Sequence, residues 1–193
     1  MTAIAEATER RYPPGDLAIW IFILAELSVF AVFFAAYAFT RMGDPELFDT
    51  YQQTLDRRAA LINTLALITS SYFVVRSVAA IRSDDSLGCV RWLLAAIAMG
   101  LLFLVVKSVE YAHHLGEGIN LSTNTFYMFY LSLTFFHFMH VILGMVILAA
   151  VAIKANAGGY SAAEHTGVET GASYWHMVDL VWLILFPLVY VMH

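Results

Sequence analysis

The chain has 193 residues, of which 61% are hydrophobic and only 13% are charged, and its formal net charge is −5. Together with a mean hydropathy of +0.73, this composition is typical of an integral membrane protein and excludes an ordinary soluble domain. No nucleic-acid partner is expected, because the sequence has no basic block. The lone cysteine, Cys89, excludes an internal disulfide and any thiolate-ligated zinc or iron–sulfur site built from this chain alone.

Five stretches are long and apolar enough to cross about 30 Å of hydrocarbon, which takes about 20 helical residues. They predict an all-α integral membrane protein, a five-transmembrane-helix bundle that forms a single membrane domain over residues 1–193. The spans are expected near 17–40, 59–81, 92–113, 125–153 and 172–192.

The boundaries of the first span carry recognisable signals. Asp16 follows two prolines and a glycine and can cap the first free amides of a helix, which should end near Gly43-Asp44-Pro45. In the polar loop that follows, four apolar residues fall at helical spacing and predict a short surface helix: Leu47, Phe48, Tyr51 and Leu55.

Basic residues near the ends of the spans predict the orientation of the bundle, because flanking lysine and arginine tend to stay in the cytoplasm. One side would carry Arg10, Arg11, Arg82, Arg91 and Lys154, and the other Arg41, Arg57 and Arg58. This excess favours a cytoplasmic N-terminus and an external C-terminus in the inner membrane of a bacterial cell.

Ionisable side chains inside the spans need an explanation, because each costs at least about 2.5 kcal/mol at the centre of a bilayer. Glu26 lies near the middle of the first span. It is either a neutral or hydrogen-bonded carboxyl that fixes helix packing or a site of proton or lipid contact, and both interpretations stay open.

The third span places Lys107, Glu110 and His114 on one helical face near its end. Long side chains at such a position can reach the membrane surface, so Lys107 and His114 are expected to form an interfacial pair. Residues 110–113 also match half of a di-iron carboxylate motif, but no second Glu-x-x-His occurs in the sequence.

Two further polar pairs occur in the last two spans. His137 and His140 could together ligate a metal, but polar packing between helices, with Gly144 permitting close approach, is favoured over a metal site. In the last span, His176 and Asp179 share a face and are expected to bond to each other. Glu169 lies just ahead of them and can cap the helix or pair nearby.

The sequence also lacks the patterns of several catalytic classes. It contains no glycine-rich phosphate loop, no nucleophile elbow and no His-Glu-x-x-His motif. A two-haem cytochrome would need histidines at matched depths on two helices, whereas His137 and His140 occupy one helix. No catalytic centre and no metal site are therefore expected within this chain.

Five motifs, in order and in spacing, resemble subunit III of the haem–copper oxidases. They are ILAELSVFAVFFAAY around Glu26, INTLALITSS at 62–71, VEYAHHLGEGI at 109–119, FFHFMHVILGM at 135–145 and GVETGASYWHMVDLVWLILF at 167–186. The last motif is the most specific, and the likeness runs from about Asp16 to the C-terminus. Since the sequence starts at the glutamate-bearing span, it resembles the short five-helix members found in quinol oxidases and the accessory protein associated with nitric oxide reductase.

The resemblance implies an accessory, non-redox subunit that docks on a catalytic subunit holding haem and copper. It also implies that this chain binds no metal cofactor itself but does bind phospholipid, and that it supports proton uptake by its partner. Glu26 matches the family's carbodiimide-reactive glutamate, which is linked to proton delivery and lipid contact. Polar positions of the family's bundle are matched by Glu110, His137, His140, Glu169, His176 and Asp179.

Two expectations combine the resemblance with the spacing. Glu26 is expected to reach His137 or His176, and the titratable groups of the spans are expected to pair among themselves. The competing functions are a free-standing proton or small-solute transporter and an enzyme with a histidine-ligated metal. Transporters of the first kind often carry inverted repeats and broken helices, which this sequence does not show.

Overall fold

A computed structural model of the protein describes residues 15–192, and in that part every regular element is a helix. The elements are α1 (Leu17–Gly43), α2 (Pro45–Gln52), α3 (Arg57–Arg82), α4 (Ser86–Gly116), α5 (Thr125–Asn156), α6 (Thr166–Phe186) and a π-helical turn, η1 (Pro187–Val191). Five segments are long and apolar enough to span a membrane: α1, α3, α4, α5, and α6 together with η1. The predicted all-α, five-helix membrane fold is confirmed.

The helices extend beyond the predicted apolar spans, most clearly at the starts of α4 and α6. The third span was expected from residue 92, but α4 begins at Ser86 after Asp85, whose side chain accepts a hydrogen bond from the Gly88 amide at 2.8 Å. The fifth span was expected from residue 172, but α6 begins at Thr166. Hydropathy marks only the part of a helix that lies in hydrocarbon, whereas the helix itself starts at its cap.

The local signals around α1 and α2 act as expected. Asp16 accepts from the Ala18 amide and caps α1, and Asp44 accepts from the Leu47 amide and caps α2. The predicted short helix exists as α2, but it does not simply lie on the surface. Its Phe48 and Gln52 side chains are fully buried against the end of the bundle.

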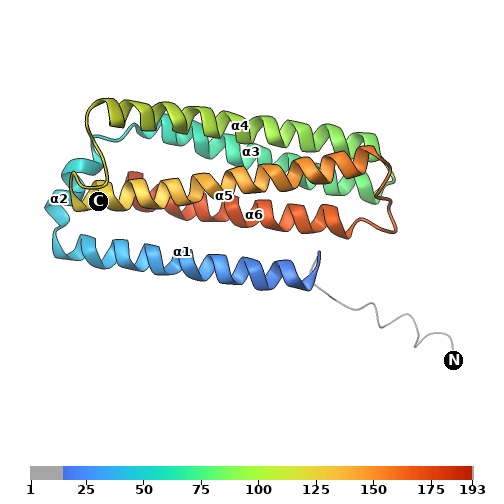
Figure 1. The fold of residues 1–193 in the computed structure, drawn as a ribbon, viewed down its shortest axis with the longest axis horizontal. Coiled ribbons are helices and arrows are strands. Elements are labelled where there is room, and N and C mark those ends of the chain that lie inside the picture. The colour runs from blue at the N-terminus through green and yellow to red at the C-terminus, as the bar shows by residue number, and fades with distance from the viewer. Residues whose placement is uncertain (1–14, 193) are drawn as a thin grey trace.

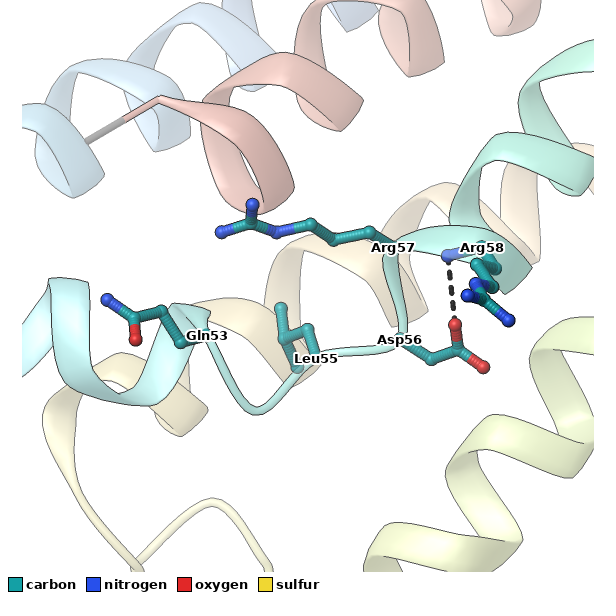
Figure 2. A pocket seen from close by; sticks show the side chains of 5 residues that line it. All are labelled: Gln53, Leu55, Asp56, Arg57 and Arg58. Carbon is teal, nitrogen blue, oxygen red and sulfur yellow. Dashed lines mark hydrogen bonds between the residues drawn. The ribbon is translucent and has the colours of Figure 1, made fainter.

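The turn between α2 and α3 is shaped by Asp56 (Figure 2). Its Oδ1 atom accepts from the amides of Arg58 at 2.9 Å and Ala59 at 3.1 Å, which starts α3. The carboxyl turns back toward α3, while the Arg57 side chain extends in another direction. Together with Gln53 and Leu55, these residues line a shallow surface hollow that is open to solvent.

Four of the long helices form the core of the molecule, and α1 lies outside them (Figure 1). Helix α3 packs against α4 and α6, and α5 packs against α4 and α6, so the four helices close a ring. Helix α1 packs mainly against α6. The ends of α1 are tied down, since the Gly15 amide bonds to Glu169 at 3.2 Å and Arg41 bonds to the Met192 carbonyl at 2.6 Å.

The ring is tightest around Trp175 of α6. A Cβ atom added at Gly144 of α5 would lie 2.8 Å from a ring carbon of Trp175, and one added at Gly100 of α4 would lie 3.0 Å from another. The indole is therefore held between two glycines on neighbouring helices. The close approach expected at Gly144 is present, because the residue has no side chain to keep Trp175 away.

A larger residue at position 144 should destabilise this packing. We expect Gly144→Leu to lower the free energy of unfolding by about 1–3 kcal/mol, because the new side chain must displace Trp175. Gly116→Leu is the matched control, since nothing lies within 4 Å of the Cβ position there. Thermal unfolding of the detergent-solubilised chain, followed by near-ultraviolet circular dichroism, measures both, and equal losses would contradict the role of the contact.

Candidate functional site

The most completely buried charge among the described residues is Lys107 of α4, which has no exposed surface. Its Nζ atom lies 3.1 Å from Glu110 Oε2, and it donates to the hydroxyls of Tyr130 at 3.1 Å and Tyr190 at 2.6 Å. Both hydroxyls in turn donate to Glu110 Oε1, that of Tyr190 at 2.9 Å. The lysine, the carboxylate and the two phenols thus form a closed network.

Aromatic rings surround the same ammonium group. Nζ lies 4.8 to 5.9 Å from the ring centroids of Tyr111, Tyr130, Trp182 and Tyr190, distances at which the ring faces attract a cation. These side chains come from α4, α5, α6 and η1, so the network joins four elements. Tyr190 is brought into place by the π-helical turn that follows Pro187.

The expected interfacial pair of Lys107 and His114 is therefore wrong. Lys107 points into the bundle, where Glu110 and the tyrosines neutralise it, and it does not reach the membrane surface. His114 is 5% exposed and lies about two helical turns further along α4, with Glu117 3.9 Å from its Nδ1 atom. Spacing along one helix did not reveal the hydroxyls of Tyr130 and Tyr190, because they come from other elements.

Glu26 meets His140 where α1 packs on α5. Its Oε2 atom lies 3.0 Å from His140 Nε2, while His140 Nδ1 bonds to the Phe136 carbonyl at 2.7 Å. Because a carbonyl only accepts, Nδ1 carries a proton, and the bond to Glu26 needs one more proton, held by either Nε2 or the carboxyl. The two side chains are only partly covered, at 11% exposure for His140 and 21% for Glu26.

The expectation that Glu26 reaches His137 or His176 is wrong, and the reason is the direction of each histidine. His140 faces α1, whereas His137 points into the ring, where Phe103 and Trp182 lie 5.6 and 5.2 Å from it between ring centroids. Both ring nitrogens of His137 lack a hydrogen-bond partner among the described residues. The two histidines therefore do not converge on one point, and no group of three or more potential metal ligands occurs within residues 15–192.

The last predicted pair, His176 and Asp179, lies close to a third residue. His176 Nδ1 bonds to the Ser71 hydroxyl of α3 at 2.6 Å, and Ser71 also lies near Asp179. Within the described residues His176 and Asp179 form no direct bond, so the expected contact between them is wrong in detail. Ser71 links α6 to α3, which the sequence could not show because the residues are 105 positions apart.

Glu169 holds three elements together at the start of α6. Its carboxylate bonds to Arg82 of α3 at 2.6 Å, lies 3.2 Å from His165, and accepts from the Gly15 amide at 3.2 Å. The expectation that this residue pairs near the start of the span is confirmed. The ion pair with Arg82 is partly exposed and is worth at most about 1 kcal/mol.

A groove runs along the outside of the bundle between α3 and α6, with a volume of about 250 Å³. We call it the α3–α6 groove. It is lined on α3 by Val75, Val78, Ala79 and Arg82, and on α6 by Glu169, Ala172, Ser173 and His176.

Comparison with known proteins finds matches over nearly the whole chain. The family described as cytochrome c oxidase subunit III matches residues 15–193. The chain belongs to this family. A cytochrome c oxidase subunit 3 of Thermostichus vulcanus is 35% identical and one of Synechocystis sp. is 33% identical; both alignments cover 99% of this chain, and 94% and 86% of the relatives. A probable quinol oxidase subunit 3 of Staphylococcus saprophyticus is 26% identical over 98% of this chain and 96% of its own length.

Family membership makes the chain subunit III of a haem–copper oxidase, and such a subunit has a catalytic subunit as its partner. The polar residues described above then belong to a membrane protein that works within a larger complex. The network around Lys107 is its most buried electrostatic element.

Removing only the cation of that network should destabilise the protein more than removing the cation and the carboxylate together. We expect Lys107→Met to lower the free energy of unfolding by about 3–5 kcal/mol, because Glu110 would remain buried without its cation. The double variant Lys107→Met/Glu110→Gln should recover much of this loss, since no unpaired charge is left. Unfolding of the four members of the cycle in detergent measures the coupling, and simple additivity of the two single losses would contradict the network.

Proposed function

We propose that this chain is an accessory subunit that performs no redox chemistry and that stabilises the catalytic subunit of an oxygen-reducing haem–copper complex. The observation that supports this most directly is the engagement of its intramembrane charges with one another. Lys107 is neutralised by Glu110, and Glu26 by His140. Haem and copper would be held by the partner, and this chain would bind neither.

The oxidase names of the relatives favour oxygen over nitric oxide as the acceptor of the complex. The matched relatives are called cytochrome c oxidase or quinol oxidase subunits. Their names also span both electron donors, cytochrome c and quinol. Identifying the catalytic subunit that co-purifies with this chain would establish both the electron acceptor and the electron donor of the complex.

The proposed orientation places the N-terminal end of α1 on the cytoplasmic side of a bacterial inner membrane. The α3–α4 turn and the α5–α6 loop lie at that same end of the bundle (Figure 1). Arg82, Arg91 and Lys154 lie near these connections. Arg10 and Arg11 also support this orientation, but they lie outside the described residues.

Lipid binding is the second part of the proposal, and an outward-facing apolar groove supports it. Its volume is about 580 Å³ and it lies where α1, α4 and α5 meet. It is lined by Phe33, Tyr111, Leu115, Leu121, Leu131, Ser132, Phe135, Phe136 and Met139. A lining of this kind suits a phospholipid acyl chain.

The acyl-chain groove lies beside the Glu26–His140 pair. Phe136 lines the groove, and its ring centroid is 4.6 Å from that of His140. An acyl chain in the groove would shield the partly covered pair from the rest of the bilayer. We propose that the subunit assists proton uptake by its partner through the proton that Glu26 and His140 share. The acyl chain would keep this proton away from the rest of the bilayer.

The central prediction concerns association. We expect the tagged chain, extracted in mild detergent, to co-purify with a larger subunit that shows haem absorption, while the separately expressed chain shows none. A free-standing transporter is the competing function, and the purified chain in vesicles would then move protons by itself. Proton flux through the isolated chain, or the failure of any haem-bearing subunit to co-purify, would overturn the proposal.

A second prediction concerns the lipid. We expect Met139→Trp to fill the acyl-chain groove and to reduce the bound phospholipid by about one molecule per chain, as counted by native mass spectrometry. Leu101→Trp is the control, because Leu101 is similarly exposed on α4 but does not line the groove. Unchanged lipid in Met139→Trp, or equal loss in both variants, would contradict this site.

A further inference from the structure

One intramembrane hydrogen-bonding group faces outward without a partner among the described residues. His176 uses Nδ1 for its bond to Ser71, and its ring lines the α3–α6 groove, but no hydrogen bond is formed by Nε2. The residue lies ten positions after Thr166, the first residue of α6, which is about 15 Å along the helix axis. It also lies four positions, or about 6 Å, after residue 172, where the apolar span was expected to begin, so His176 lies inside the hydrocarbon.

Several other polar groups on outward faces of the bundle are satisfied within the protein. On α1, the Ser28 hydroxyl bonds to the Leu24 carbonyl of its own helix, and Glu26 is engaged by His140. On α3, the Thr69 hydroxyl bonds to the Leu65 carbonyl. Hydrocarbon can cover these positions without leaving a donor or acceptor unpaired.

A phospholipid does not complete the α3–α6 groove. The polar atoms of a lipid remain at the membrane surface, and its acyl chains offer no hydrogen bond at the depth of His176. A side chain carried by another transmembrane helix can supply one, and interhelical hydrogen bonds of this kind help membrane helices to associate.

The borders of the groove also suit a helix. Ile68, Tyr72 and Val75 form an exposed stripe on α3 at spacings of three and four residues, and Leu180 and Ile184 continue an exposed stripe on α6. The two stripes flank a channel in which His176 carries the unbonded ring nitrogen, while Arg82, Glu169 and Ser173 line it toward the start of α6. An apolar helix with one polar side chain matches this pattern.

We propose that the α3–α6 groove is the surface on which a transmembrane helix of the catalytic subunit docks, with a polar side chain of that helix bonded to His176 Nε2. The inference rests on the proposed function, because it takes the catalytic subunit as the occupant. Ser71 acts as a positioning residue, since its bond to Nδ1 holds the imidazole so that Nε2 faces the groove.

Photocrosslinking in intact membranes tests the surface. Benzoylphenylalanine replaces Tyr72 or Leu180 at the groove, Leu94 on the outward face of α4, and Val32 on α1, all of which are exposed. We expect adducts with the catalytic subunit from positions 72 and 180 and none from position 94. Adducts with the catalytic subunit from position 32 alone would indicate that α1 is the docking face.

The outcomes separate this inference from the proposed function. Adducts only with lipid at positions 72 and 180, or with the catalytic subunit only from positions 94 or 32, overturn the docking surface while the chain remains a subunit. The absence of adducts from all four positions in a chain that still co-purifies overturns it as well. If no catalytic subunit co-purifies, the proposed function itself fails.

Two substitutions of His176 test the hydrogen bond. The amide of His176→Asn lies where Nδ1 is and can keep the bond to Ser71, whereas the longer His176→Gln reaches the position of Nε2 and the groove. We expect His176→Asn to reduce the co-purified catalytic subunit about fivefold, the effect of about one net hydrogen bond, and His176→Gln to retain it. Thr69→Val is the control, because the Thr69 hydroxyl bonds to the Leu65 carbonyl of its own helix. We expect it to leave the amount of co-purified catalytic subunit unchanged.

A purely structural role of His176 predicts the reverse order, because His176→Gln would lose the bond to Ser71 that joins α6 to α3. Thermal unfolding of the isolated variants reports that internal bond separately. Loss of the complex in His176→Gln with retention in His176→Asn, or retention in both variants, would overturn the proposed contact.

Discussion

The structure depends on one constraint: at membrane depth a polar side chain finds no water and must find its partners within the protein. The Lys107 network meets this constraint most completely. One ammonium, one carboxylate and two phenols bond to one another, and four rings surround the cation. Since its members come from α4, α5, α6 and η1, satisfying the charge also fixes how these elements meet.

The other polar contacts follow the same rule at the edges of the ring. Ser71 joins α3 to α6 through His176, and Glu169 ties α3, α6 and the start of α1 together. Helix α1 depends on fewer contacts, because it packs outside the ring and is fixed by its two ends and by Glu26. The bundle is thus a closed core of four helices with one helix attached along its side.

This arrangement suits a subunit III. The most buried charge among the described residues, that of Lys107, is paired with Glu110. Glu26 and His140 beside an apolar groove, and His176 in another groove, retain some exposure on the outside of the bundle. These outward sites are where lipid and the catalytic subunit would complete the structure.

The sequence by itself determined the five spans, the cap at Asp16, the helix α2 and the family, because these depend on composition, local spacing and motif order. It also identified which residues are costly in a membrane. Only the tertiary structure decided their partners: Glu26 with His140, Lys107 with Glu110 and two tyrosines, and His176 with Ser71. The physical reason is that helical periodicity fixes which residues share a face, whereas the rotation and depth of neighbouring helices decide which faces meet.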